Sequence, residues 1–224
     1  MKKFSFFSKG IQVEFNPIVN QRLEVIAHEA IMRFDELIPP QEELQFDTFE
    51  LTQFQVNLDS LYKRLAIKTY KGSVPLLLCA SPNQMPHMLP IPKEYELIVT
   101  ISQPVFLFNT EMTKEHLNYL TGKGVNFALD GFGHKFLSLP FLINLQPKFI
   151  KFANEIIIAC QDEKILNRLV KLIQPFKEMG IQFIADGIES QEQFDRMKLL
   201  ADAFEGAWIS ELMVNRDRHV DESI

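Results

Sequence analysis

The chain has 224 residues, of which 46% are hydrophobic and 23% are charged, as is ordinary for a globular protein that buries a full core. Its net charge is −6 and its lysines and arginines are scattered, so we expect no nucleic-acid partner. No stretch reaches the roughly 18 apolar residues of a membrane span, so we expect no stable membrane insertion. Cys79 and Cys160 lie in apolar runs and are predicted to be reduced thiols, which predicts a cytoplasmic location.

Short apolar runs alternate along the chain with stretches whose apolar residues have helical spacing. In chain order the pattern predicts strands at 11–19 and 25–34, a helix at 49–70, strands at 74–80 and 96–102, a helix at 113–120, a strand at 125–130, a helix at 137–144, a strand at 147–152, a helix at 161–179, a strand at 181–186, a helix at 190–203 and a strand at 207–210. The strand runs are continuous in apolar character, which is typical of strands covered on both faces.

This order of elements favours an α/β fold, a modified TIM-type (β/α)8 barrel. The first two strands are separated by a turn at Asn20 and Gln21, so they can form an antiparallel hairpin. A doubly wound open sheet is the alternative. We expect an N-terminal arm over residues 1–10, one barrel over 11–212 and a polar C-terminal tail over 213–224.

In a TIM-type barrel the C-terminal strand ends form the rim that carries the active site. The polar residues predicted at this rim are Glu29, Cys79, Thr100, Asp130, Lys151, Asp186 and Glu189. The segment IADGIES at 184–190 places two carboxylates, Asp186 and Glu189, where a strand turns into a helix. Such a cluster can bind divalent cations or act as acid and base. Alternatively, Asp186 and Glu189 only favour a helix N-terminus and Lys151 only neutralises Asp130; spacing alone leaves both interpretations open.

Several motifs, in order, resemble the EAL domain, the phosphodiesterase family that opens cyclic di-GMP. The similar segments are NPIV at 16–19, HEAIMR at 28–33, LDGFGHKFLSLPFL at 129–142, LINLQPKFIKFA at 142–153, IADGIESQEQ at 184–193 and EG at 205–206. The resemblance covers residues 11 to about 212, nearly the whole chain. It implies a barrel whose strand ends hold two divalent metal ions that activate a water molecule.

The resemblance carries several functional residues over to this chain. Glu29 and Asp130 match metal ligands, and Lys151 matches the family's lysine. Asp186 stands at the position of the proposed general base, a glutamate in the family, and is one methylene shorter. We predict that Lys151 and Asp186 are vestigial catalytic residues and that Glu29 and Asp130 are what remains of a metal site.

Three metal-facing positions depart from the family. Cys79 aligns with an asparagine, Thr100 with a glutamate and Gly131 with the second aspartate of a pair. A thiol is a poor ligand for magnesium, and glycine offers no side-chain ligand. Because two divalent ions need many hard oxygen ligands, we predict that the paired-metal site has been lost.

The residues predicted to face a ligand are altered as well. Arg33 suits a phosphate because its guanidinium is a planar fork, although a salt bridge to Glu29 or Asp35 is the alternative. Asn16 and Glu205 each stand where the family has a glutamine. Glu189, the second acid of the segment IADGIES, is also predicted to face the ligand. Glu205 adds negative charge, which disfavours a dianionic dinucleotide.

Together these features predict a degenerate, catalytically silent EAL domain of bacterial signalling, a regulatory binding module that acts through an unidentified protein partner. No cofactor is expected in that case. The alternatives are a non-catalytic cyclic di-GMP receptor and a weak cyclic di-GMP phosphodiesterase that uses magnesium or manganese.

Overall fold

The computed structural model describes residues 11–34, 48–80, 90–102, 110–134, 142 and 146–221. The strands are β1 (Ile11–Asn20), β2 (Val25–Phe34), β3 (Leu76–Ala80), β4 (Leu97–Ser102), β5 (Asn126–Phe132), β6 (Phe149–Phe152), β7 (Gln182–Asp186) and β8 (Ala203–Glu205). The helices are α2 (Thr48–Thr69), α4 (Thr110–Gly122), α6 (Asn154–Ala159), α7 (Glu163–Glu178), α8 (Gln191–Met197) and α9 (Ala207–Asp221).

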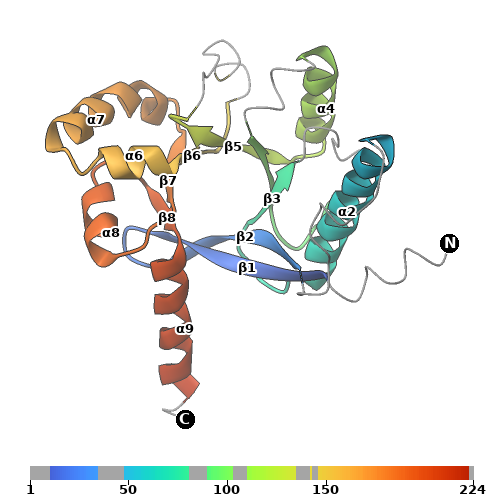
Figure 1. Cartoon of the computed structure of the whole chain (residues 1–224), viewed down its shortest axis with the longest axis horizontal. Helices are drawn as coiled ribbons and strands as arrows, with labels where there is room; N and C mark the ends of the chain where they lie inside the picture. The colour runs from blue at the N-terminus through green and yellow to red at the C-terminus, as the bar shows by residue number, and fades with distance from the viewer. Residues whose placement is uncertain are drawn as a thin grey trace.

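The eight strands close into a barrel in chain order, with helices around its outside (Figure 1). β1 is antiparallel to both β2 and β8, and the remaining neighbours are parallel. The predicted barrel with an antiparallel first pair is therefore confirmed, and the open-sheet alternative is wrong. No helix in the described ranges has the length and apolar character needed to cross a membrane.

The turn between β1 and β2 is fixed by one side chain. The Asn20 Oδ1 atom accepts hydrogen bonds from the backbone N–H of Arg22 at 2.8 Å and of Glu24 at 3.1 Å. Asparagine is favoured in turns because its side chain can satisfy the backbone locally. The predicted hairpin at Asn20 is thus confirmed, and it sets the register between the two strands.

The barrel interior is filled by a layer to which every strand contributes one apolar side chain. These are Ile18, Ala27, Leu77, Ile98, Ala128, Phe149, Ile184 and Ala203. Side chains two residues apart on a strand point to the same face of the sheet. On each strand, the residue two positions from the apolar layer toward the C-terminal rim therefore also points into the barrel. This apolar layer is therefore the floor of the barrel mouth, and the next inward-facing residue of each strand lies directly above it.

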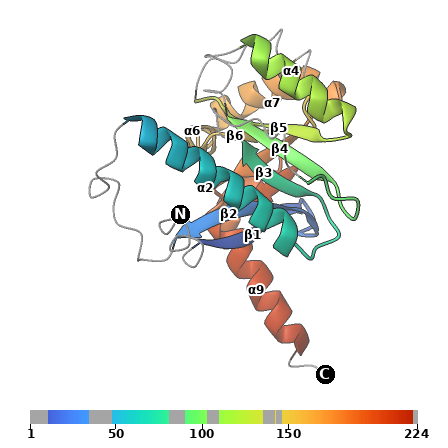
Figure 2. The ribbon, with the colours of Figure 1, turned by 90° about the vertical axis from the view of Figure 1, so that its right-hand side faces the viewer.

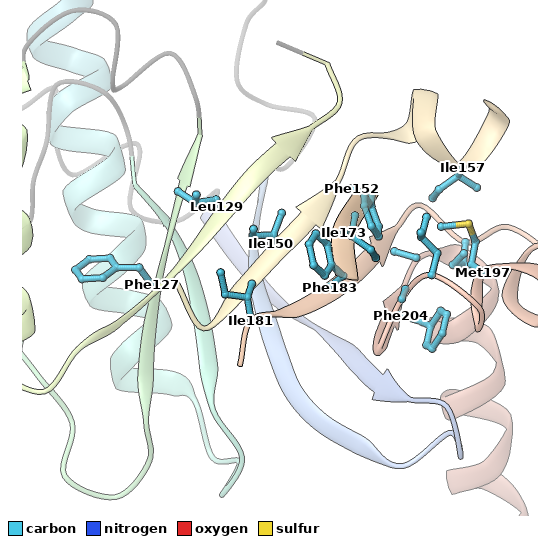
Figure 3. Close-up of a cluster of buried hydrophobic side chains, with 14 of the residues drawn as sticks. Phe127, Leu129, Ile150, Phe152, Ile157, Ile173, Ile181, Phe183, Met197 and Phe204 are labelled. Carbon is cyan, nitrogen blue, oxygen red and sulfur yellow. The ribbon is translucent and has the colours of Figure 1, made fainter. Parts of the chain in front are cut away.

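The outer faces of the strands pack against the helices. Figure 3 shows the larger cluster, in which the rings of Phe152 and Phe183 stack with centroids 5.0 Å apart. A smaller cluster packs Tyr62 and Ala66 of α2, and Tyr70 just after the helix, against β2, β3 and β4. Figure 2 shows α2 crossing this side of the barrel and α9 projecting away from β1. Burial on both faces explains why the strand runs are continuously apolar.

Several predicted boundaries are wrong toward the C-terminus. The predicted strand at 207–210 is the start of α9, which runs to Asp221 through most of the predicted polar tail. The last strand is instead the fully buried segment of Ala203 to Glu205, and Gly206, at φ +144°, separates it from α9. The predicted helix at 190–203 ends at Met197 in α8, because the chain must then enter β8.

Among the described helices, α6 was not predicted, and other predictions fall outside the described residues. α6 follows β6 directly, and Asp162 then caps α7, so the predicted helix at 161–179 begins at Glu163. The predicted arm at 1–10 and all but Leu142 of the predicted helix at 137–144 lie outside the described residues.

Candidate ligand site at the barrel mouth

The inward position above the apolar floor carries a polar, charged or thiol side chain on each strand. In strand order these residues are Asn16, Glu29, Cys79, Thr100, Asp130, Lys151, Asp186 and Glu205. The register pairs Asn16 with Glu29, Cys79 with Thr100 and Asp186 with Glu205. The structure therefore brings together, in one ring at the barrel mouth, predicted site residues from eight separate strands.

Lys151 is the centre of this ring. Its Nζ atom lies 2.8 Å from Glu29 Oε1, 2.7 Å from Glu205 Oε1 and 3.2 Å from Asp186 Oδ2. Lys151 and Glu205 are both buried. The interpretation that Lys151 only neutralises Asp130 is wrong, because its ion-pair partners come from β2, β7 and β8. One ammonium group thus faces three carboxylates.

This imbalance of charge shifts the protonation of the cluster. Burial alone lowers the pKa of Lys151, but Glu205, Glu29 and Asp186 outweigh burial and raise it well above its ordinary value. Burial raises the pKa of Glu205. Lys151 lowers it by attraction, and the neighbouring Glu29 and Asp186 raise it further, so the pKa lies well above its ordinary value. We infer that Lys151 stays charged and that Glu205 keeps a proton more readily than an ordinary glutamate does.

The strands β3, β4 and β5 supply a different set of groups to the ring. Water reaches the Cys79 side chain, yet the protein around it raises the pKa of the thiol, first by desolvation and then through the charge of Glu29. The buried Thr100 Oγ1 atom has no hydrogen-bond partner in the described part of the chain. Gly131, at φ +78°, has open space where a side chain would begin. On this arc of the ring only Asp130 offers a carboxylate.

Two predicted ligand residues lie outside the ring. Arg33 Nε donates to Glu14 Oε2 at 2.9 Å across the hairpin, and both side chains are exposed. Its predicted ion pair with Glu29 is therefore wrong, since Glu29 binds Lys151 instead, and Asp35 is not among the described residues. The Glu189 side chain is exposed, and its backbone N–H donates to Gln193 Oε1 at 2.7 Å within a cap at the start of α8.

Sequence reasoning missed a second buried lysine near the ring. Lys63 of α2 is buried and forms an ion pair with Asp59 one turn earlier on the helix. Its charge lowers the pKa of Cys79, opposing the effect of Glu29. Charges four residues apart on a helix are usually a solvated pair, so only the packing of α2 reveals that this pair faces inward. His134, in contrast, is exposed and its Nδ1 atom lies 2.6 Å from Glu155.

The loop that ends β8 depends on Gly206. A Cβ atom at this position would lie 2.3 Å from the backbone nitrogen and 2.4 Å from the backbone oxygen of Ile188. We expect Gly206→Ala to lower the free energy of unfolding by at least about 2 kcal/mol, from this clash and from the strain at φ +144°. Urea denaturation would check this. Gly122→Ala, where the space is open, is the control, and an equal loss in both would contradict the expectation.

Comparison with known proteins agrees with this geometry. The sequence model of the EAL domain matches residues 5–211 of the chain. The cyclic di-GMP phosphodiesterase PdeB of Shewanella oneidensis is 31% identical over 105 residues, which are 45% of this chain and 12% of PdeB. The oxygen sensor protein DosP of Escherichia coli K12 is 25% identical over 105 residues, which are 46% of this chain and 13% of DosP. The chain thus aligns with about an eighth of the length of these curated relatives.

Solved structures share the same fold. PaMucR, a phosphodiesterase in complex with c-di-GMP, superposes with a TM-score of 0.71 at 17% identity over 92% of each chain. A standalone EAL protein of Vibrio cholerae O395, in its c-di-GMP-bound form, superposes with a TM-score of 0.66 at 20% identity over 88% of this chain and 89% of its own. With the sequence model spanning almost the whole barrel, these findings show that the chain belongs to the EAL domain family.

Proposed function

We propose that this chain is a catalytically silent EAL domain that acts as a regulatory binding module through a protein partner. The observation that carries the proposal is the arrangement around Lys151. Glu29, Asp186 and Glu205 direct their oxygens at one buried ammonium group at distances of 2.7 to 3.2 Å. Carboxylates that would otherwise be available to cations are thereby engaged within the protein.

The donors present do not fit a paired-metal centre. Two divalent ions bring four positive charges and require several hard oxygen ligands. On the arc of β3, β4 and β5, the raised pKa of Cys79 keeps its thiol neutral, and Gly131 adds no ligand. Within the ranges that the structure describes, no three or more His, Cys, Asp or Glu side chains are grouped so that they could hold a metal ion. A reaction step through a bound metal is therefore not part of the proposed function.

A cyclic di-GMP receptor without turnover is the second candidate. The polar ring at the barrel mouth favours it, and so do the fold neighbours whose structures contain c-di-GMP. Two observations rank it lower. Arg33 is already paired with Glu14, and the ring holds four carboxyl groups for one lysine, which disfavours a dianionic ligand. Weak phosphodiesterase activity with magnesium or manganese is the third candidate.

The cellular location is part of the same proposal. Cys79 and Cys160 are both free thiols in the structure. Thiols persist in a reducing compartment, so we place the protein in the cytoplasm.

A time course of cyclic di-GMP hydrolysis tests the proposal. The full chain is incubated with the dinucleotide in magnesium and in manganese, and linear products are separated and quantified. We expect no product above the level of a Glu29→Ala control, because too few oxygen donors remain for two ions. Linear product that Glu29→Ala abolishes would overturn the proposal and establish a weak phosphodiesterase. Tight calorimetric binding of cyclic di-GMP without product would favour the receptor instead.

A further inference from the structure

We propose that the exposed face of α7 docks an acidic amphipathic helix of a partner protein. This inference rests on the proposed function, because it names the surface through which the binding module would act. Figure 1 shows α7 at the periphery of the molecule, on the side of the barrel away from α2. The surface combines an apolar stripe and a basic stripe that run side by side along the helix.

The apolar stripe consists of Ile165 and Leu172 of α7 and of Met179, the C-cap residue that follows the helix. Their side chains are 37%, 58% and 44% exposed. Seven residues make almost two turns of an α-helix, so residues at this spacing lie on one side. Leu166 and Ile173, each one position later, are buried in the core and account for the attachment of α7 to the barrel. The stripe is therefore additional to the face that α7 needs for folding, and it supplies the apolar part of the proposed docking surface.

The basic stripe consists of Lys164, Arg168 and Lys171. The three side chains are exposed and follow one another at spacings of four and three residues, which places them on one side of the helix. None of them has an ion-pair partner in the part of the chain that the structure describes. Successive residues of an α-helix are about 100° apart around its axis. This rotation places the basic stripe next to the apolar stripe on the solvent side of α7.

Charge complementarity selects the kind of partner. The chain carries a net charge of −6, so three adjacent cations that have no ion-pair partner among the described residues are a local exception. A helix with apolar residues at heptad spacing and flanking Asp or Glu would bury the apolar stripe and neutralise the basic one. A second copy of the chain fits less well. In a parallel pairing of α7 with itself, Arg168 and Lys171 would meet the same cations of the other copy.

A peptide titration tests this surface. The probe is a fluorescent synthetic helix with leucines at heptad positions and glutamates at the flanking positions. A second probe has lysines in place of the glutamates. We expect the glutamate probe to bind the full chain at least about tenfold more tightly than the lysine probe, and its binding to weaken as salt is raised. Fluorescence anisotropy measures both affinities.

Three variants make the test specific. Leu172→Gln should weaken binding of the glutamate probe about tenfold or more, because a leucine no longer enters the interface. Leu199→Gln is the matched control, since Leu199 is 64% exposed but lies outside α7, and it should leave the affinity unchanged. The double variant Arg168→Glu with Lys171→Glu should reverse the preference toward the lysine probe.

Other results would overturn the inference. Equal binding of the two probes, or binding that Leu172→Gln leaves intact, would show that α7 does not dock an acidic helix. A dimer in sedimentation that Leu172→Gln dissociates would assign the surface to a second copy. These outcomes are independent of the hydrolysis assay. Failed peptide binding leaves the silent-domain proposal standing, and product formed by the wild-type chain would refute that proposal without touching this surface.

Discussion

Replacing Lys151 with methionine is expected to lower the free energy of unfolding by about 3–5 kcal/mol. Methionine fills a similar volume but removes the cation that the three carboxyl groups share. Glu29, Asp186 and Glu205 would then face one another without a counter-charge, and Glu205 is itself buried. Urea denaturation near neutral pH, followed by circular dichroism, gives the difference between the variant and the wild-type chain.

A partly exposed ion pair provides the control. Lys177 Nζ lies 2.8 Å from Asp202 Oδ1, with both side chains partly exposed to water. Lys177→Met should cost at most about 1 kcal/mol. Adding Glu205→Gln to Lys151→Met should recover part of the loss, because it removes one of the uncompensated carboxylates. A Lys151→Met penalty no larger than that of Lys177→Met would show that the cluster does not stabilise the fold.

The pH dependence of this penalty has a defined sign. The pKa of Lys151 is raised in the folded state. Its contribution to the free energy of unfolding is therefore fully present below the ordinary lysine pKa and is lost only in alkali, above the folded-state pKa. The raised pKa of Glu205 means that the folded state keeps this proton longer than the unfolded state does. As pH falls, Glu205 becomes neutral before the ordinary carboxyl range is reached. The difference between Lys151→Met and the wild-type chain should therefore shrink at acidic pH.

The ring at the barrel mouth was predictable because strand geometry leaves little freedom. Once the apolar runs are identified as strands covered on both faces, residues at their C-terminal ends must meet at one rim. Glu29, Asp130, Lys151 and Asp186 were placed there correctly from the sequence. The ion pairs among them were not predictable, because spacing along the chain does not tell which carboxylate reaches a lysine on another strand.

The errors have specific physical causes. β8 has only three residues, too few for a strand pattern, whereas the apolar run around Trp208 belongs to the buried side of a helix. Gly206, which separates the two, is the signal that could have located the boundary. Glu14 was overlooked because its relevance depends on the hairpin register, which places it near Arg33 on the adjacent strand.

Restoring three donors should create a manganese site in this barrel. The variant combines Cys79→Asn, Thr100→Glu and Gly131→Asp, which returns the family's residue types to β3, β4 and β5. These strands do not supply the carboxylates that hold Lys151, so the new oxygens remain available to cations. Because losing one supporting ligand typically costs 10–100-fold in metal affinity, we expect a gain of roughly 100-fold or more. Electron paramagnetic resonance of free and bound Mn²⁺ measures the affinity.

Position 131 needs its own control because its backbone is unusual. Gly131 has φ +78°, a conformation that aspartate tolerates better than most residues, and nothing lies within 4 Å of a Cβ atom placed there. Substituting alanine instead of aspartate at this position, with the other two changes kept, imposes at least as much backbone strain but offers no ligand, so it should lose most of the gain in Mn²⁺ affinity. If the wild-type chain already bound Mn²⁺ as tightly as the triple variant, the oxygen donors present in the wild-type chain would be enough to hold the metal. The electrostatic basis of the silent-domain proposal would then be wrong, since the carboxylates around Lys151 would be free enough to serve a metal.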